Sequence, residues 1–201
     1  MKWIMIVSLW LALGAVNAQE TQLRQAFGRS YVLEKETRYK EAAAALMPVY
    51  DNEAYELNLR LGWLHYKAGQ YTESLRYYDR SRKIRPMSIE AKLGYALPAA
   101  ALEHWDQVLS TYLDILNIDP NETTALYQVG VIYYYRKDYD KADKYLGKLV
   151  NLYPFGYNGL LMLGWNRLQQ GRMSEARVLF NKVLLYDPSD ASALEGLSLI
   201  K

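Results

Sequence analysis

NIDPNET, residues 117–123, carries one of only six prolines in a chain of 201 residues. This proline belongs to a series, because Pro86, Pro120, Pro154 and Pro188 follow one another at a constant interval of 34 residues. Proline stops a helix, since it lacks a backbone N–H group and its ring clashes with the preceding turn. A helix stop at one fixed interval, four times in succession, indicates a repeated structural unit.

The residues ahead of each proline repeat as well, and their spacing predicts the local structure. When the repeats are aligned on their prolines, similar residues recur 15, 12, 8 and 5 positions before each proline. These positions are three or four residues apart and therefore lie on one helical face. Pairs of a large apolar residue and a glycine lie further upstream in register, so each unit is expected to hold two amphipathic helices. The columns are Tyr71, Trp105, Tyr139 and Met173; Ser74, Val108, Ala142 and Ala176; Tyr78, Tyr112, Leu146 and Phe180; Ser81, Ile115, Leu149 and Val183; the pairs are Leu61-Gly62, Val129-Gly130 and Leu163-Gly164.

Two stretches, LYQVGVIYYYRKDYDKADKYLGKLVNLYP (residues 126–154) and LLMLGWNRLQQGRMSEARVLFNKVLLYDP (residues 160–188), resemble the tetratricopeptide repeat family. The resemblance implies an all-α fold, a right-handed superhelical solenoid of about five tetratricopeptide helix pairs plus a C-terminal capping helix. Stacking is needed because one helix pair cannot bury its apolar face alone. The expected units are approximately residues 21–54, 55–88, 89–122, 123–156 and 157–190, with the cap at 191–201.

The two ends of the array depart from this pattern. The first unit is expected to use the pair Phe27-Gly28 and to have a longer loop between its helices than the other units. In the cap, DASALEGLSLIK at residues 190–201, Leu194 and Leu197 are expected to face inward. The remaining markers of the first unit are Tyr31, Tyr39, Ala42 and Leu46.

The third unit departs from the pattern inside its first helix. Ala96 stands where the other units have glycine, and Pro98 follows it within the helical stretch. A proline inside a helix costs roughly 3 kcal/mol unless a kink absorbs it. We therefore expect a kink near Gly94 to Pro98.

The N-terminal stretch MKWIMIVSLWLALGAVNAQE, residues 1–20, predicts export. Lys2 precedes an apolar run, and the small residues Val16 and Ala18 flank Asn17. This order is typical of a secretory signal peptide, and the run is short for a membrane span of roughly 20 residues. We expect cleavage after Ala18, a mature domain at residues 19–201 in the periplasm or outside the cell, and no integral membrane span after cleavage.

Composition argues against several classes of partner and chemistry. Lysine and arginine number 24 against 22 acidic residues, so no basic surface for nucleic acid is expected. The absence of cysteine removes disulfides, zinc–thiolate sites and catalytic thiols. We therefore expect neither a cofactor nor a metal site.

The sequence predicts a protein without catalytic activity. No glycine-rich phosphate loop and no serine-centred nucleophile elbow is present. Of the two histidines, His65 is expected to pack between helices and His104 to lie exposed in a turn. Acidic pairs fall at turns between helices, and in the second pair, Asp187 and Asp190, both residues are expected to cap helices. These pairs are Asp138 with Asp140 and Asp187 with Asp190.

The family resemblance implies that the first helix of each pair lines a concave groove. The residues at the groove positions are mostly apolar or aromatic, and such a patch, if exposed, marks an interaction site rich in hot-spot types. The alternative is that these residues are buried between neighbouring helices. Lys, Asn and Arg would occupy these positions in a domain that grips acidic chaperone tails, so a carboxylate clamp is not expected. The candidates are Leu59, Trp63, Tyr66, Leu93, Leu97, Tyr127, Val131, Tyr134, Tyr135, Leu161, Trp165 and Leu168.

These observations predict an exported, non-catalytic scaffold, assembly factor or adaptor that binds another protein or peptide in its groove. One alternative is a self-assembling homo-oligomer, in which the groove of one copy accepts the terminal helix of another. A second alternative is a carbohydrate-binding accessory in envelope polysaccharide handling, with groove aromatics stacked on sugar rings.

Overall fold

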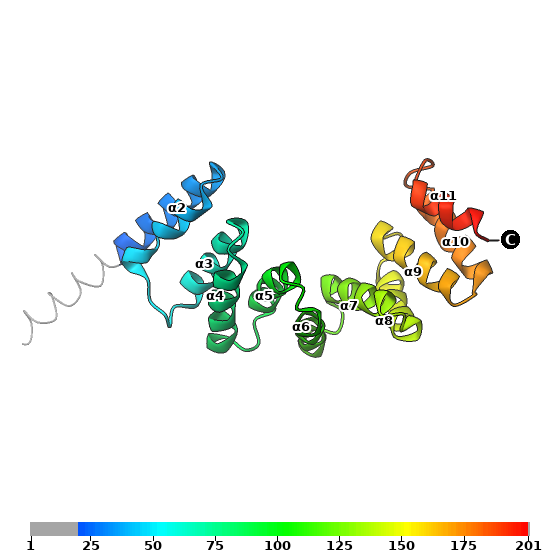
Figure 1. Ribbon diagram of the computed structural model, residues 1–201, viewed down its shortest axis with the longest axis horizontal. Coiled ribbons are helices and arrows are strands. Elements are labelled where there is room, and N and C mark those ends of the chain that lie inside the picture. The colour runs from blue at the N-terminus through cyan, green and yellow to red at the C-terminus, as the bar shows by residue number, and fades with distance from the viewer. Residues whose placement is uncertain (1–19, 201) are drawn as a thin grey trace, which may run out of the picture. The chain divides into compact units, whose positions relative to one another are not determined.

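The computed structural model describes residues 20–200, and every regular element among them is a helix. The predicted signal peptide lies outside these residues. No helix in the described part is long and apolar enough to cross a membrane. After a helix at residues 20–35 come α2 (Tyr39–Ala44), a short 3-10 helix (Met47–Val49), α3 (Tyr55–Lys67), α4 (Tyr71–Ile84), α5 (Ile89–Ala101), α6 (Trp105–Ile118), α7 (Thr123–Tyr135), α8 (Tyr139–Leu152), α9 (Tyr157–Gln169), α10 (Met173–Val183) and α11 (Ala191–Ser198) (Figure 1).

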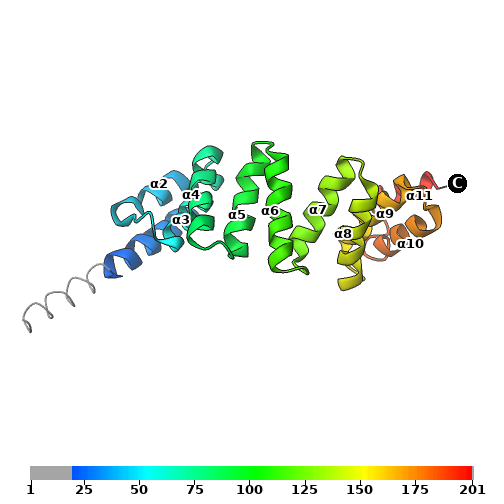
Figure 2. The same cartoon turned by 90° about the horizontal axis from the view of Figure 1, so that it is seen from below.

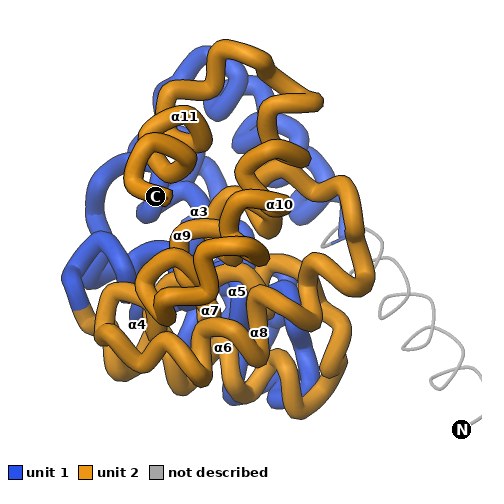
Figure 3. The backbone as a smooth tube through the Cα atoms, turned by 90° about the vertical axis from the view of Figure 1, so that its right-hand side faces the viewer, with its two compact units in different colours: residues 1–103 blue, residues 104–201 orange. Residues whose placement is uncertain are grey.

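The chain forms two compact units, residues 1–103 and 104–201 (Figure 3). The division falls in the turn between α5 and α6, inside the third repeat. Each unit buries apolar residues of its own. A buried cluster of unit 1 contains Leu33, Ala42, Ala43, Leu46, Leu57, Leu61, Leu64 and Tyr77, and one of unit 2 contains Ala142, Leu146, Leu160, Leu163, Leu168, Ala176, Leu179, Phe180, Val183, Ala193 and Ile200.

Glycines allow the two helices of a pair to pack closely. The pairs α3–α4 and α7–α8 can be followed in Figure 2. A Cβ atom at Gly130 of α7 would lie only 2.5 Å from Cγ of Leu146 in α8. Gly164 of α9 makes the corresponding approach to the ring of Phe180 in α10. The two helices that the 34-residue register predicts are thus packed closely at these glycines.

The large residue of a second helix that packs against the glycine of its own pair can also contact the next repeat. The ring of Tyr78 in α4 packs against Gly62 of its own pair, and it also meets Gly94 of α5. A Cβ atom at Gly94 would clash with Cε1 of Tyr78. Gly196 of α11 approaches Phe180 in the same way. One aromatic residue of a second helix therefore joins two first helices.

Each of the five turns inside a helix pair contains one residue in the left-handed backbone region. In the fourth pair this is Lys137, whose N–H donates to the Tyr134 carbonyl oxygen (2.9 Å), while Asp138 N–H donates to the Tyr133 carbonyl oxygen (3.0 Å). Such bonds satisfy carbonyl groups at the end of a helix. The left-handed residues are Thr37 (φ 60°), Gly69 (73°), Glu103 (59°), Lys137 (60°) and Gly171 (76°).

The first unit corrects two of the expectations. Its turn at Thr37 has the same length as the other four, so its loop is not longer. Gly28 is exposed, and a Cβ atom added there would meet no neighbour within 4 Å, whereas Ser30 is fully buried. Counted back from the turn, Ser30 takes the place that glycine has in other units, because serine is also small enough for a buried helix contact.

The third unit keeps a continuous helix across its proline. α5 extends to Ala101, and Leu102 N–H still donates to the carbonyl oxygen of Pro98 (3.1 Å). Pro98 is therefore accommodated without ending the helix, and its ring is buried. The kink near Gly94 stays a prediction.

Asp190 caps a helix as expected, but Asp187 and the face of the last helix differ from the prediction. Asp138 caps α8, and Asp190 Oδ1 accepts a hydrogen bond from Ala193 N–H of α11 (2.7 Å). Asp187 instead accepts from Ser189 N–H within the preceding turn (2.9 Å). Leu194 does not face inward, because its side chain is 46% exposed. The first helix of a complete pair is covered by its second helix, and α11 has none in the described chain.

Candidate interaction surfaces

The predicted groove residues lie on α3 and α5 of unit 1 and on α7 and α9 of unit 2. We call the surface that they form the inner face of each unit. Leu97 and Tyr135 are exposed, at 37% and 75%. The half-buried members are Leu59, Trp63, Tyr66, Leu93, Tyr127, Val131, Tyr134, Leu161 and Trp165.

Leu168 is not part of this surface, which corrects its assignment as a groove residue. Its side chain is only 8% exposed and belongs to the buried cluster of unit 2, together with Phe180 and Ile200. The C-terminal segment returns to this core, where the Ile200 carbonyl oxygen accepts a hydrogen bond from Arg177 (3.4 Å). The spacing along α9 predicted on which face of the helix Leu168 lies. It did not predict that the C-terminal segment covers that face at the last turn.

Trp63 is held by a buried polar network in unit 1. Its indole N–H donates to Glu34 in the helix of residues 20–35, and Glu34 forms an ion pair with Arg60 (2.5 Å). Arg60 is 8% exposed, donates to Ser30 Oγ, and lies 3.9 Å from the ring centre of Tyr31. Burial raises the pKa of the Glu34 carboxyl, but the hydrogen bonds from Trp63 and Arg60 outweigh it and hold the pKa below its usual value.

The same network bears on the expectation that unit 1 carries no carboxylate clamp, which stays a prediction. The guanidinium of Arg60 is paired with the carboxylate of Glu34 and is shielded from solvent. It is therefore not accessible to an acidic peptide. Lys67 is exposed, and its amino group lies 5.3 Å from the ring centre of Trp63. The inner face of unit 1 thus carries leucine and aromatic side chains, with the exposed amino group of Lys67 at its edge.

Trp165 makes an analogous bridge in unit 2. Its indole N–H donates to Ser192 Oγ of α11 (2.9 Å), and its ring meets Phe180 edge to face at 5.4 Å. Trp63 and Trp165 therefore each bond to a neighbouring first helix while remaining half-buried. Half-burial is compatible with both alternatives considered for these tryptophans, core and groove, and both stay predictions.

Tyrosines dominate the inner face of α7. The rings of Tyr134 and Tyr135 meet edge to face at 5.4 Å, and Tyr134 also contacts Tyr139 at 5.8 Å. Burial raises the pKa of Tyr127 and Tyr134. Their phenol groups therefore stay protonated at neutral pH and can donate hydrogen bonds.

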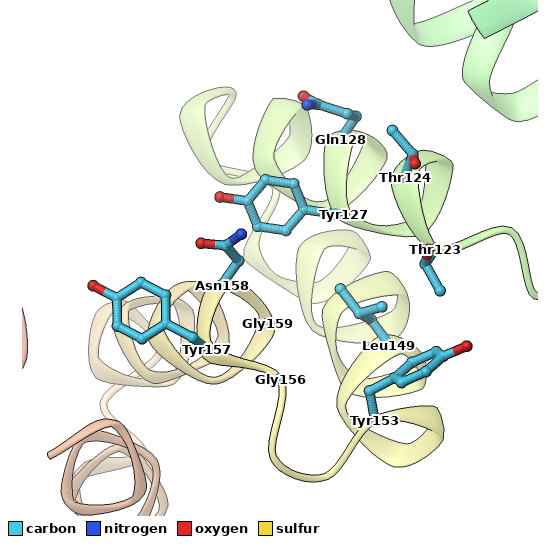
Figure 4. Close-up of a pocket in the computed structure, with 10 residues that line it drawn as sticks. All are labelled: Thr123, Thr124, Tyr127, Gln128, Leu149, Tyr153, Gly156, Tyr157, Asn158 and Gly159. Carbon is cyan, nitrogen blue, oxygen red and sulfur yellow. The ribbon is translucent and has the colours of Figure 1, made fainter. Parts of the chain in front are cut away.

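Beside Tyr127 the surface of unit 2 is hollowed. The hollow has a volume of about 610 Å³ and lies where the first turns of α7 and α9 meet the end of α8 (Figure 4). In Figure 4, Tyr127 of α7 and Asn158 of α9 lie on one side, and Leu149 and Tyr153 come from the end of α8. None of its lining residues is charged: Thr123, Thr124, Tyr127, Gln128, Leu149, Tyr153, Gly156, Tyr157, Asn158 and Gly159.

Exposed aromatic residues form a rim next to this hollow. Tyr153, Phe155 and Tyr186 are 55%, 50% and 47% exposed. The rings of Phe155 and Tyr186 stack at 4.1 Å, and Tyr186 meets Tyr157 edge to face at 6.1 Å. Tyr157 donates a hydrogen bond to Asp190, which raises the pKa of Tyr157.

Sequence reasoning did not find the hollow or its rim. Asn158 and Gln128 look like ordinary solvent-facing residues near a helix start, and Tyr153 and Phe155 flank the closing proline of the repeat. A run of aromatic residues around that proline was the one available signal.

Both histidines take structural places, as expected. His65 stacks on Tyr77 at 5.1 Å, and its Nδ1 lies 2.8 Å from Oε1 of Gln70. His104 is exposed at the start of α6.

Known proteins share the repeat pattern. Models of the tetratricopeptide repeat match residues 27–89, 124–155 and 159–190, which is more than half of the chain. The chain is similar to the photosystem I assembly protein Ycf3 of Prochlorococcus marinus (strain NATL1A), with 29% identity over 142 residues that cover 60% of this chain and 80% of Ycf3. It is also similar to anaphase-promoting complex subunit 6 of Arabidopsis thaliana, with 26% identity over 132 residues that cover 64% of this chain and 24% of that protein.

Solved structures share the fold. A tetratricopeptide repeat protein from Parabacteroides merdae superposes with a TM-score of 0.79 at 20% identity, over 89% of this chain and 72% of that one. MamA from Desulfovibrio magneticus RS-1 gives 0.74 at 18% identity, over 85% and 97%. YrrB, described as having an unusual peptide-binding site, gives 0.74 at 14% identity, over 92% and 97%.

Tetratricopeptide repeats are non-catalytic modules through which proteins bind other proteins. In this chain, the 34-residue register, the close contacts of Gly130 with Leu146 and of Gly164 with Phe180, and the matched stretches agree with one another. The chain belongs to the tetratricopeptide repeat family.

Proposed function

We propose that the protein is an exported scaffold or assembly adaptor, which binds a peptide or a helix of its partner on the inner face. The observation that carries the proposal is the exposure of Leu97 on the inner face of unit 1 and of Tyr135 on that of unit 2, where half-buried Tyr127 and Tyr134 lie on the same helix as Tyr135. An amphipathic helix or an extended segment can cover apolar groups of this kind, and tyrosine is enriched among binding hot spots.

Two similar proteins support this direction. Ycf3 is named as an assembly protein, and YrrB is described as a peptide-binding member of the family. By analogy with these two proteins, we infer that this chain binds a protein partner during the assembly of a complex.

The binding proposal is tested with two exposed positions of the inner face. The mature chain serves as bait for crosslinked capture from the native envelope, beside a Leu97→Asp/Tyr135→Asp variant. Val178→Asp is the matched control, since Val178 is 57% exposed but lies on the second helix α10. We expect a partner that is captured by the wild type and the control and lost with the double variant. Equal capture by all three, with equal melting temperatures, would contradict binding on the inner face.

Export is tested by the intact mass of the protein recovered from the periplasm or medium. Cleavage after Ala18 leaves a chain that begins at Gln19. A mass that still includes Trp3 would contradict cleavage at this position.

A second candidate function is self-assembly, which is favoured by exposed apolar side chains on α11 and directly after it. Leu194 and Leu199 are 46% and 56% exposed. Light scattering over a concentration series should then show a rising mass that Leu194→Asp/Leu199→Asp abolishes. A constant monomer mass for the wild type would contradict it.

A further inference from the structure

We propose that the hollow of unit 2, together with its aromatic rim, binds an uncharged segment of a polypeptide. This inference rests on the proposed binding function and names a separate site for it, at the ends of the helices. The hollow meets the inner face through Tyr127, so one extended segment can lie on both.

The charge distribution selects a neutral occupant. None of the lining residues is charged, and the acids that cap α7 and α11 are already engaged. Glu122 caps α7, accepting from Thr124 N–H (3.1 Å) and Ala125 N–H (2.6 Å). Asp190 caps α11 and accepts from Tyr157. A charged residue entering the hollow would lose water and meet no oppositely charged side chain in its lining, which is unfavourable.

The polar groups of the wall match a peptide backbone. Gln128 and Asn158 each present a carboxamide, which has both donors and an acceptor, and Thr123 and Thr124 add hydroxyl groups. Peptide units carry the same two functions, one N–H and one C=O for each residue. The volume of about 610 Å³ lies in the usual range for a small binding site.

The arrangement of the rings favours a peptide over a sugar. Phe155 and Tyr186 stack on each other with an interplanar angle of 19°, so one face of each ring is already covered and less aromatic surface is left for stacking on a sugar ring. Tyr186 also meets Tyr157 at 79°. Their exposed edges form an apolar border, which suits the side chains of a segment that leaves the hollow.

The test uses three pools of randomised dodecapeptides and the mature full chain. One pool contains uncharged residues only, the second adds Asp and Glu, and the third adds Lys and Arg. A photo-crosslinking residue in place of exposed Tyr153 reports occupancy of the hollow, and one in place of Tyr135 reports the inner face. We expect the uncharged pool to bind best and to crosslink from position 153.

Asn158→Asp places a charge in the hollow, and the first turn of α9 accommodates an acid there. We expect it to weaken binding of the uncharged pool about tenfold or more. Asn181→Asp, the same change on the exposed surface of α10, should leave binding unchanged.

Equal or better binding of a charged pool, or an unchanged affinity of Asn158→Asp, would overturn the proposal. So would saturable binding of chitohexaose in place of peptides at position 153. Crosslinks from position 135 alone would contradict peptide binding in the hollow but would agree with binding on the inner face. Absence of peptide binding from both positions would contradict both.

Discussion

Lys137, Glu103 and Thr37 have backbone angles that glycine adopts more easily. They occupy the left-handed position of their turns, where the second and fifth pairs have Gly69 and Gly171. A side chain there places Cβ near the following carbonyl oxygen and costs roughly 1 kcal/mol.

Lys137→Gly should therefore stabilise the protein, by about 1 kcal/mol in the free energy of unfolding. Gly171→Ala tests the opposite direction and should destabilise it by a similar amount. Urea unfolding followed by circular dichroism measures both. A destabilised Lys137→Gly variant would show that the left-handed conformation of Lys137 does not lower the stability of the fold.

At the scale of the helix, close packing depends on small residues opposite large ones. Gly94→Ala would push a methyl group into the ring of Tyr78, which is 3% exposed and has little space to move. We expect a loss of about 1–3 kcal/mol.

Gly28→Ala is the matched control for this prediction, because Gly28 is also helical but faces open space. It should gain about 0.5–1 kcal/mol, since alanine favours helix more than glycine does. Thermal melting of both variants measures the contrast. Equal shifts of the two would exclude a packing effect at Gly94.

The stability that the ion pair between Glu34 and Arg60 contributes to unit 1 should depend on pH. The pKa of Glu34 lies below its usual value of 4.5, so its ion pair with Arg60 stabilises the fold fully above that pH. The contribution is lost as the pH falls through the lowered pKa, because the unfolded chain then binds the proton more readily.

Glu34→Gln should cost about 2 kcal/mol at pH 7, because it leaves the Arg60 charge buried without a partner. The difference from the wild type should shrink below pH 4. Glu41→Gln, which removes an exposed ion pair with Arg38, should change the stability much less. A difference that stays constant from pH 7 to pH 3 would contradict the ion-pair account.

At the scale of the whole chain, each repeat relies on its neighbours in sequence. Leu163 of α9 and Leu61 of α3 hold equivalent places and belong to separate buried clusters. An array of this kind loses stability locally when one repeat is damaged.

Leu163→Ala should therefore speed amide hydrogen exchange in α8 to α11, with a local cost of about 2–5 kcal/mol. Leu61→Ala should act on α3 and α4 instead. Exchange followed by mass spectrometry separates the two patterns. Equal acceleration in all helices by either variant would show that the chain unfolds as one unit.

The sequence by itself determined the repeat, the helix pairs and the apolar faces of their second helices. These follow from local rules, because proline stops a helix and spacings of three and four residues define one face. Gly130 and Gly164 stand in that register, and the structure shows that they meet Leu146 and Phe180 of the paired helices.

The tertiary structure decided what covers each face. Ser30 replaced the expected Gly28, Leu168 became buried, Leu194 became exposed, and Trp63 was bound by Glu34 from another helix. Periodicity describes one helix at a time, whereas exposure depends on the atoms that a neighbouring helix brings to that face. The uncharged hollow beside Tyr127 arises in the same way, where the ends of three helices meet.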